Sequence, residues 1–151
     1  RFWPKFKGRD GCRTPMPWVS DNQNGGFSDA KPWLPMAVEH LERAVSTQQN
    51  DDASTLAFYR NMIRFRQSFP ALVKGSFEFV THAEGIVSFI REHEGQSVFC
   101  AFNLTNMAQP VTLPEGEWQQ DQGAPFTTIV TDKDVTLPPY QAYFGVRAET
   151  V

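Results

Sequence analysis

The hydrophobic pattern of the chain changes its period after Gly75, and this change constrains the fold more than any other feature. From that glycine onward, apolar residues alternate with polar ones or form short continuous runs, as they do in strands. The pattern predicts strands over residues 76–82, 85–94, 97–105, 109–114, 126–132 and 135–148, with a hairpin turn at "EHEGQ". Strands at such short spacing predict a small antiparallel β-sandwich over residues 75–151.

One clear helix precedes the strands, over residues 50–69. Asp52 or Ser54 can cap its N-terminus, and Pro70 lies just beyond its end. At 100° per residue, one half of the helical wheel is apolar, and it comprises Leu56, Phe58, Tyr59, Met62, Ile63, Phe65 and Phe69. We expect this half to be buried against a broad surface. Arg66 falls within it, so we expect its guanidinium to meet a carboxylate or carbonyl oxygens.

The first 36 residues are rich in proline and contain three of the four tryptophans, which makes regular structure improbable there. In the stretch "GRDGCRTPMPW", residues 8–18, Pro15 and Pro17 fix their own backbone angles and favour extended conformations before them. The many aromatic residues argue against disorder. The sequence therefore predicts a stiff, packed loop, followed by a short helix at 38–45, and long loops in compact proteins are usually functional.

The chemistry of this loop is concentrated in two arginines and two tryptophans. Arg9 and Arg13 each present a planar fork of donors that suits carboxylates and can also span the oxygens of a polyol. Asp10 is a natural ion-pair partner, so simple fastening of the loop is the alternative role. Trp18 and Trp33 can stack on the apolar face of a sugar, with packing in a core as the alternative.

Composition excludes several other functions. A net charge of -3 argues against nucleic acid as a general partner, and no window approaches the roughly 18 apolar residues of a membrane span. The first residues contain no signal-peptide core, so we expect a cytoplasmic protein. Cys12 and Cys100 lack zinc-ligand spacing and are expected to be free thiols. We therefore expect no metal and no cofactor in this chain.

No catalytic centre is predicted within the chain. The spacing of Asp10, Asp21 and Asp29 singles out no pair of carboxyl groups for acid and base work, and the histidines are scattered. No serine or cysteine lies in a nucleophile-elbow pattern. Because the chain starts without methionine in the middle of a structured loop, we expect it to be the C-terminal part of a longer protein.

The series "GRDGCRTPMPW", "NGGFSDAKPWLPM", "FYRNMIRFRQSFPALVKGSF" and "LPPYQAYFGV" resembles the end of an α-glucosidase of glycoside hydrolase family 13. The oligo-1,6-glucosidases and dextran glucosidases belong to the same group. The resemblance implies an α+β fragment: the last loop and helix of a (β/α)8 barrel over residues 1–73, then an antiparallel β-sandwich over 74–151. The outside of the barrel sheet is then the expected partner of the apolar helix face.

The resemblance also assigns roles. The catalytic aspartate, the glutamic acid/base and a second aspartate of the family come from earlier barrel strands, so none is expected in these residues, and any metal site is expected upstream as well. Arg13 matches the family arginine of the "RTPM" element and is expected to grip the terminal glucose of a small α-glucoside or oligosaccharide. Arg9 is a second candidate for substrate binding, while Asp10 and Trp18 are expected to support the loop.

Two other readings stay open from the sequence. Relatives with the same barrel isomerise or transfer sugars, among them trehalose synthases and sucrose isomerases, and "NGGFS" is similar to trehalose synthases. "PMPW" followed by "KPWLPM" is closer to α-glucosidases, so retaining hydrolysis is the leading expectation. As an isolated chain, the β-rich part is alternatively a sugar-binding or purely structural sandwich.

Overall fold

The computed structural model describes residues 8–80, 83–121, 123–124, 126, 129–130 and 134–148. The chain forms two compact units, Arg1–Arg60 and Asn61–Val151. Each is described by itself. The predictions that concern residues 81–82, 127–128 and 131–133 lie outside the described residues.

Unit 1 is largely irregular, as expected from its prolines. Its described regular elements are a 3-10 turn η1 (Asp10–Cys12), the short helices α1 (Val38–Leu41) and α2 (Val45–Gln48), and the first residues of α3 (Thr55–Ser68), which continues into unit 2. The single helix expected at 38–45 is therefore two one-turn helices. They are separated because the backbone of Ala44 leaves the helical conformation, with φ of -59° and ψ of 154°.

Helix α3 (Thr55–Ser68) lies within the predicted range 50–69 and begins after Ser54, one of the two predicted caps. The hydroxyl of Ser54 accepts a bond from the Ala57 amide at 3.1 Å, which makes Ser54 the N-cap. The same hydroxyl donates to the Gln48 carbonyl, and the Gln48 side-chain oxygen accepts from the Leu56 amide. The start of the helix is thereby tied to α2.

The apolar half of α3 is covered on one side only. Met62, Phe65 and Phe69 pack in the core of unit 2, whereas Tyr59 and Ile63 are 62% and 54% exposed. Arg66 has an exposed side chain, and no ion pair includes it in the part of the chain that the structure describes. The partner of Arg66 stays a prediction, and its side chain lines a hollow together with Met62 and Phe65 of the covered side.

Pro70 does not simply terminate the helix. It is the first residue of a second short helix, α4 (Pro70–Lys74), where a proline costs no hydrogen bond. Arg91 then fastens the end of α4 to the sheet, because its guanidinium donates to the carbonyls of Leu72, Gly75 and Ser76. Cations near helix C-termini satisfy carbonyls that lack helical partners.

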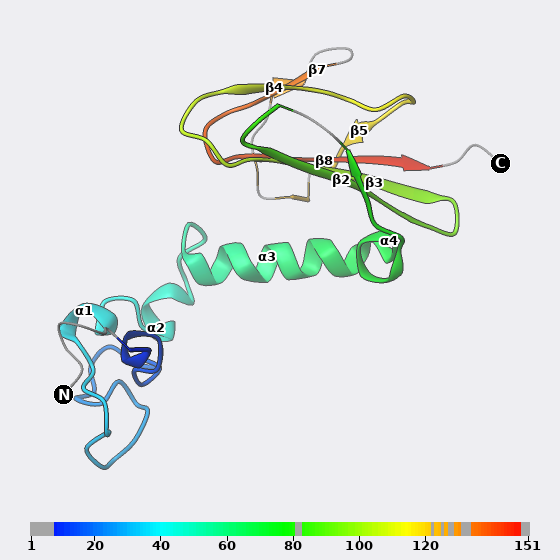
Figure 1. The fold of residues 1–151 in the computed structure, drawn as a ribbon. Coiled ribbons are helices and arrows are strands. Elements are labelled where there is room, and N and C mark those ends of the chain that lie inside the picture. Colours follow the sequence, from blue (N-terminus) through cyan, green and yellow to red (C-terminus); the bar gives the residue numbers. More distant parts are fainter. Residues whose placement is uncertain are drawn as a thin grey trace. The chain divides into compact units, whose positions relative to one another are not determined.

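The rest of unit 2 is a pair of antiparallel sheets (Figure 1). The five-stranded sheet has the order β1 (Glu78–Val80), β2 (Ile86–His93), β3 (Gln96–Asn103), β8 (Ala142–Ala148), β5 (Gln119–Gln120). The three-stranded sheet has the order β4 (Gln109–Thr112), β7 (Asp134–Leu137), β6 (Ile129–Val130). The expected hairpin turn is confirmed, since Glu94 and Gly95 join β2 to β3 with φ of 46° and 78°, as a type I′ turn requires.

The central strands of the five-stranded sheet, β3 and β8, are buried on both faces. Phe99 and Ala101 of β3 face the three-stranded sheet and form a core with Val111, Trp118, Val135, Leu137 and Tyr143. Val98 and Cys100 point the other way and pack with Phe65, Ala71, Leu72, Ala142 and Phe144. This explains why the sequence around β3 is a continuous apolar run and not an alternating one.

Two strand predictions need correction. The strand expected over 135–148 is two strands, β7 and β8, which lie in different sheets. Pro138 and Pro139 separate them because proline cannot donate to a ladder, and Tyr140 follows with φ of 57°. The two-residue strand β5 was not predicted, since Gln119 and Gln120 carry no β-forming pattern.

The two cysteines differ in accessibility, which gives a testable result. Cys100 is 1% exposed, and burial raises the pKa of its thiol from 9.0 to about 12, against a smaller lowering by Arg91. At pH 8 this thiol stays neutral and covered, whereas Cys12 is exposed. We expect iodoacetamide to label Cys12 in the native chain and Cys100 only after denaturation, as read by peptide mass spectrometry. Native labelling of Cys100 would contradict this packing.

Candidate substrate-binding loop

The loop of unit 1 is held from two sides along Pro17–Ser20. On one side, the Gly25 carbonyl accepts bonds from the amides of Trp18 and Val19, at 2.7 and 3.0 Å. On the other, the carbonyls of Pro17 and Trp18 accept from the first two amides of α2, both at 3.0 Å. Pro15 is buried just before this segment. The "TPMPW" stretch is thus a fixed frame and not a free loop.

The glycine pair of "NGGFS" lets the chain approach this frame closely. Gly25 has φ of 59°, and a Cβ there would lie 2.7 Å from Met36 Sδ and 3.0 Å from Pro17 Cα. Only glycine fits such a position without strain. The Asn24 side chain closes the following turn by donating to the carbonyls of Ser28 and Ala30. Asn24 is not among the residues predicted for the site, although an asparagine before paired glycines is a turn signal.

Arg9, Asp10 and Arg13 lie together in and around η1. The Arg13 amide donates to the Asp10 carbonyl at 3.0 Å, and both the amide and the thiol of Cys12 donate to the Arg9 carbonyl. Asp10 therefore holds Arg13 through its backbone. Within the described residues no ion pair joins the Asp10 carboxylate to either arginine.

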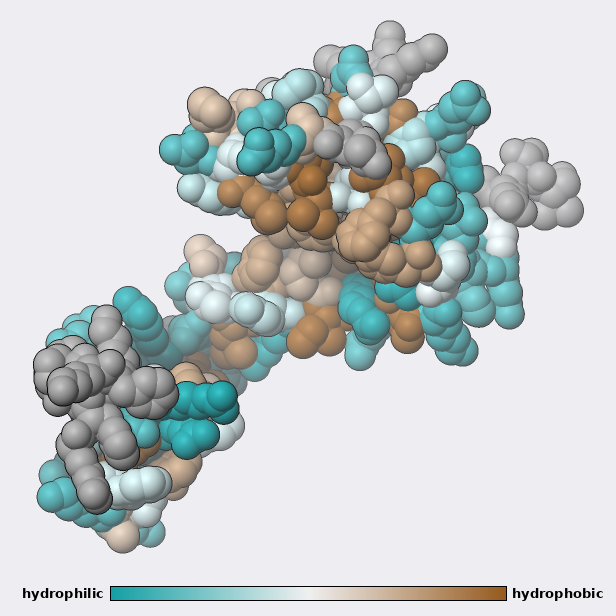
Figure 2. Space-filling model, in the orientation of Figure 1, coloured by the Kyte–Doolittle hydropathy of each residue, from teal (hydrophilic) through white to brown (hydrophobic). Residues whose placement is uncertain are grey.

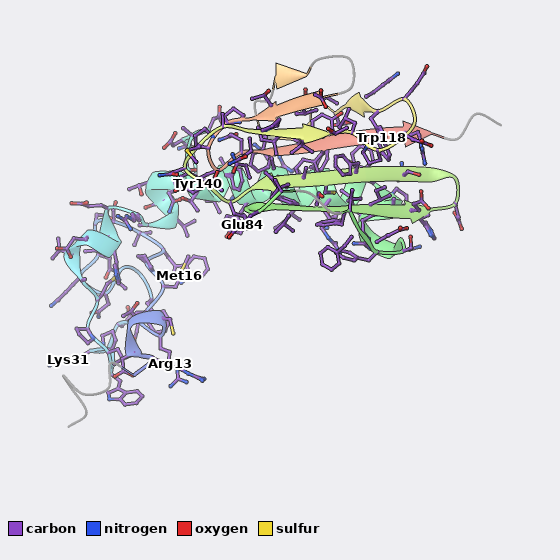
Figure 3. The ribbon with its side chains drawn as sticks, turned by 45° about the horizontal axis from the view of Figure 1, so that its top comes forward. Arg13, Met16, Lys31, Glu84, Trp118 and Tyr140 are labelled. Carbon is purple, nitrogen blue, oxygen red and sulfur yellow. The ribbon has the colours of Figure 1, made fainter. Side chains whose placement is uncertain are left out.

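The three charged side chains are all exposed, and Figure 3 shows Arg13 extending away from the loop into open space. Trp18 is 51% exposed, although its backbone is bonded on both sides. The loop thus presents two guanidinium groups on a fixed frame. Their contacts with a substrate stay a prediction.

The described residues supply binding groups and little else. No group of three or more His, Cys, Asp or Glu side chains in the described part of the chain is placed to hold a metal ion. None of the described helices combines the length and the apolar character that a bilayer crossing needs. The exposed arginines of the loop are groups that can bind an anionic or hydroxyl-rich ligand.

Comparison with known proteins identifies the family. Residues 2–75 match the model of the α-amylase catalytic domain, and residues 77–144 match that of the maltogenic amylase C-terminal domain. The chain therefore belongs to the α-amylase family, glycoside hydrolase family 13, and comprises the end of the catalytic domain followed by the C-terminal domain. The fold predicted from the sequence, a barrel end followed by an antiparallel β-sandwich, is confirmed.

Individual relatives point to the same family. A probable α-glucosidase of Rhizobium meliloti is 45% identical over 96% of this chain and 26% of its own length. A probable oligo-1,6-glucosidase of Bacillus subtilis is 34% identical over 66% of this chain and 18% of its own. The crystal structure of the α-glucosyl transfer enzyme XgtA superposes with a TM-score of 0.86 at 43% identity, over 96% of this chain and 27% of that one. The chain spans about a quarter of the length of such relatives.

Proposed function

We propose that the complete protein is a retaining α-glucosidase that hydrolyses terminal α-linked glucose from short oligosaccharides. This chain contributes the substrate-binding loop and the C-terminal β-sandwich, with the boundary between barrel and sandwich near residues 73 and 74. The catalytic carboxylates, and a metal ion if the enzyme uses one, belong to the upstream part of the same protein. A cytoplasmic location is also proposed, in keeping with two free thiols.

The observation that carries this proposal is the exposed Arg13 on a loop whose backbone is fixed on both sides. Active sites of (β/α)8 barrels are built from loops at the carboxyl ends of the strands. Because the loop backbone is already fixed there, contact with sugar hydroxyls has to order only the Arg13 side chain, which limits the conformational entropy lost on binding. Arg9 is proposed as a second contact, with Asp10 and Trp18 supporting the loop.

Exposed apolar side chains on this chain support the proposal that it packs against another part of the same protein. On unit 2, Figure 2 shows apolar residues gathered on the visible face, and Phe77, Phe79 and Leu104 are 52%, 72% and 62% exposed. On α3, Tyr59 and Ile63 are more than half exposed. Large exposed apolar patches on soluble proteins mark contact surfaces. We assign the α3 patch to the upstream barrel.

The proposal is tested by proton NMR of the complete enzyme acting on maltose and isomaltose. Cleavage of either disaccharide frees the terminal glucose as one anomer and the reducing-end glucose as its own equilibrium mixture of anomers. We expect an initial excess of α-glucose over that mixture, because in a retaining mechanism water attacks the covalent intermediate from the face that the leaving group vacated. An initial excess of β-glucose, or no release from either disaccharide, would overturn the proposal.

A second candidate is transfer of glucose to another sugar, favoured by the likeness to an α-glucosyl transfer enzyme. The same experiment separates the two. At high substrate concentration, a transferring enzyme forms about one trisaccharide for each glucose that leaves the donor disaccharide, whereas a hydrolase releases two glucose molecules from each disaccharide and forms no trisaccharide.

A further inference from the structure

Asn24 is the only asparagine in the sequence that is followed by a glycine. The backbone nitrogen of the next residue can attack an asparagine side chain, and a glycine at that place has no side chain to block the approach. Asparagine is one of the thermolabile residues of proteins. The "NGG" motif therefore contains an amide that can rearrange without an enzyme or a cofactor.

Both groups that take part in this rearrangement are hydrogen-bonded in the folded loop. The side-chain nitrogen of Asn24, Nδ2, donates to the carbonyls of Ser28 and Ala30 at 2.9 and 3.2 Å. The backbone nitrogen of Gly25, which is the attacking group, donates to the Asn22 carbonyl at 2.9 Å. A nitrogen held in this way cannot reach the side-chain carbon, so these bonds have to break before the reaction starts.

Two further hydrogen bonds keep the turn closed around Asn24. Its backbone amide donates to Oδ1 of Asn22 at 3.0 Å, and its carbonyl accepts from the Phe27 amide at 3.0 Å. Asn24 is half-buried, and Gly25 is buried. All of these contacts lie within residues 22–30, so they do not depend on which part of the complete protein covers the loop.

We propose that Asn24 is a site of spontaneous deamidation, which the closed turn protects and which reacts when the turn opens. The Gly25 nitrogen loses its proton and bonds to Cγ of Asn24, and the side-chain nitrogen leaves with that proton as ammonia. Water then opens the succinimide ring. Cleavage of the new bond leaves aspartate, whereas cleavage of the original peptide bond leaves isoaspartate, whose main chain runs through Cβ and Cγ. Water is the only co-reactant.

The deamidated product cannot close the turn again. A carboxylate has no N–H to donate, so its oxygens would face the two carbonyls that Nδ2 bonds in the unmodified loop. Isoaspartate also inserts a carbon atom into the main chain just before Gly25. The Gly25 carbonyl accepts from the amides of Trp18 and Val19. Deamidation is therefore expected to loosen the frame at residues 17–20.

The first test follows deamidation of the complete protein by peptide mass spectrometry at mildly alkaline pH, where the attacking nitrogen loses its proton more readily. We expect Asn24 to react at least about tenfold more slowly in the native protein than in the same protein unfolded in urea, since several hydrogen bonds have to break together. Ser28→Ala should raise the native rate at least about threefold, because the Ser28 hydroxyl accepts from the Ala30 amide and so fixes one partner of Nδ2.

Asn106 is the internal control, because it is exposed and followed by methionine. It should stay unmodified while Asn24 reacts in urea. Equal rates at Asn24 in the native and the unfolded protein would show that the turn gives no protection and would overturn the proposal. Modification of Asn106 before Asn24, or no modification of Asn24 in urea, would overturn it as well.

The second test measures the effect of the product on the frame, with Asn24→Asp as its mimic. In hydrogen exchange of the complete protein, we expect the Trp18 and Val19 amides to exchange at least about tenfold faster than in the unchanged protein. Asn22→Asp is the matched control. It adds the same charge nearby, but Asn22 accepts from the Asn24 amide through its side-chain oxygen, and a carboxylate keeps that bond. Unchanged protection of both amides in Asn24→Asp, or equal losses in the two variants, would contradict the proposed effect.

Discussion

Replacing Arg13 by alanine in the complete enzyme is expected to lower kcat/KM toward short α-glucosides by at least about 100-fold, as for the loss of a charged hydrogen bond of about 3 kcal/mol. The backbone of the loop does not need this side chain. The Arg13 amide bond to Asp10 and the bonds of Trp18 and Val19 to Gly25 are all made by main-chain atoms. The loss should therefore appear in catalysis without a comparable loss of stability.

Two variants make this result specific. Arg13→Lys should recover little activity, because a lysine ammonium cannot reproduce the planar fork of a guanidinium. Arg43→Ala is a matched control, since Arg43 is an exposed arginine of the same unit outside the loop. If Arg13→Ala has near-normal kcat and KM with maltose, Arg13 does not contact the substrate and the proposed role is wrong.

Asn103→Ala is expected to destabilise the sandwich by about 3 kcal/mol, because it leaves buried carbonyl oxygens without donors. Asn103 is 2% exposed, and its amide nitrogen donates to the carbonyls of Met107, Leu137 and Pro138 at 2.7, 3.1 and 3.0 Å. Its oxygen accepts from the amide and the hydroxyl of Thr105. One side chain thus joins the end of β3 to the crossover between the two sheets.

Urea unfolding followed by circular dichroism checks this prediction. Asn103→Asp should be at least as damaging at neutral pH, because a carboxylate would face three carbonyl oxygens and cannot donate to them. Its deficit should shrink as the pH falls and the new carboxyl group is protonated. The control is Asn106→Ala, an exposed neighbour. A decrease of less than about 1 kcal/mol in the free energy of unfolding of Asn103→Ala would contradict the prediction, because water or repacking would then replace the Asn103 hydrogen bonds.

Local signals in the sequence were enough for most of the fold. The period of the apolar residues located α3 and the long strands, and a serine before the helix and a glycine in the hairpin located their ends. The incorrect predictions concern prolines, because a proline can end one element and also begin or separate others. Pro70 was taken as a stop but starts α4, and Pro138 and Pro139 lie where the chain leaves one sheet for the other.

The candidate site was only partly predictable. The proline-braced arginine stretch was evident from residue types alone, but its role depends on the family resemblance. The hydrogen bonds of Asn103 could not be predicted, because two of its partners, Leu137 and Pro138, lie 34 and 35 residues away in sequence. Trp33 was recognised as a possible stacking residue, yet only its exposure, in contrast to Trp118, distinguishes it from a core tryptophan.

The most direct measurement is a crystal structure of the complete enzyme with glucose or a non-hydrolysed substrate analogue in its pocket. The account predicts the Arg13 guanidinium within about 2.7–3.2 Å of a hydroxyl oxygen of the terminal glucose, with both catalytic carboxylates contributed by residues upstream of this chain. An Arg13 side chain in bulk solvent, or turned away from the mouth of the barrel, would contradict it.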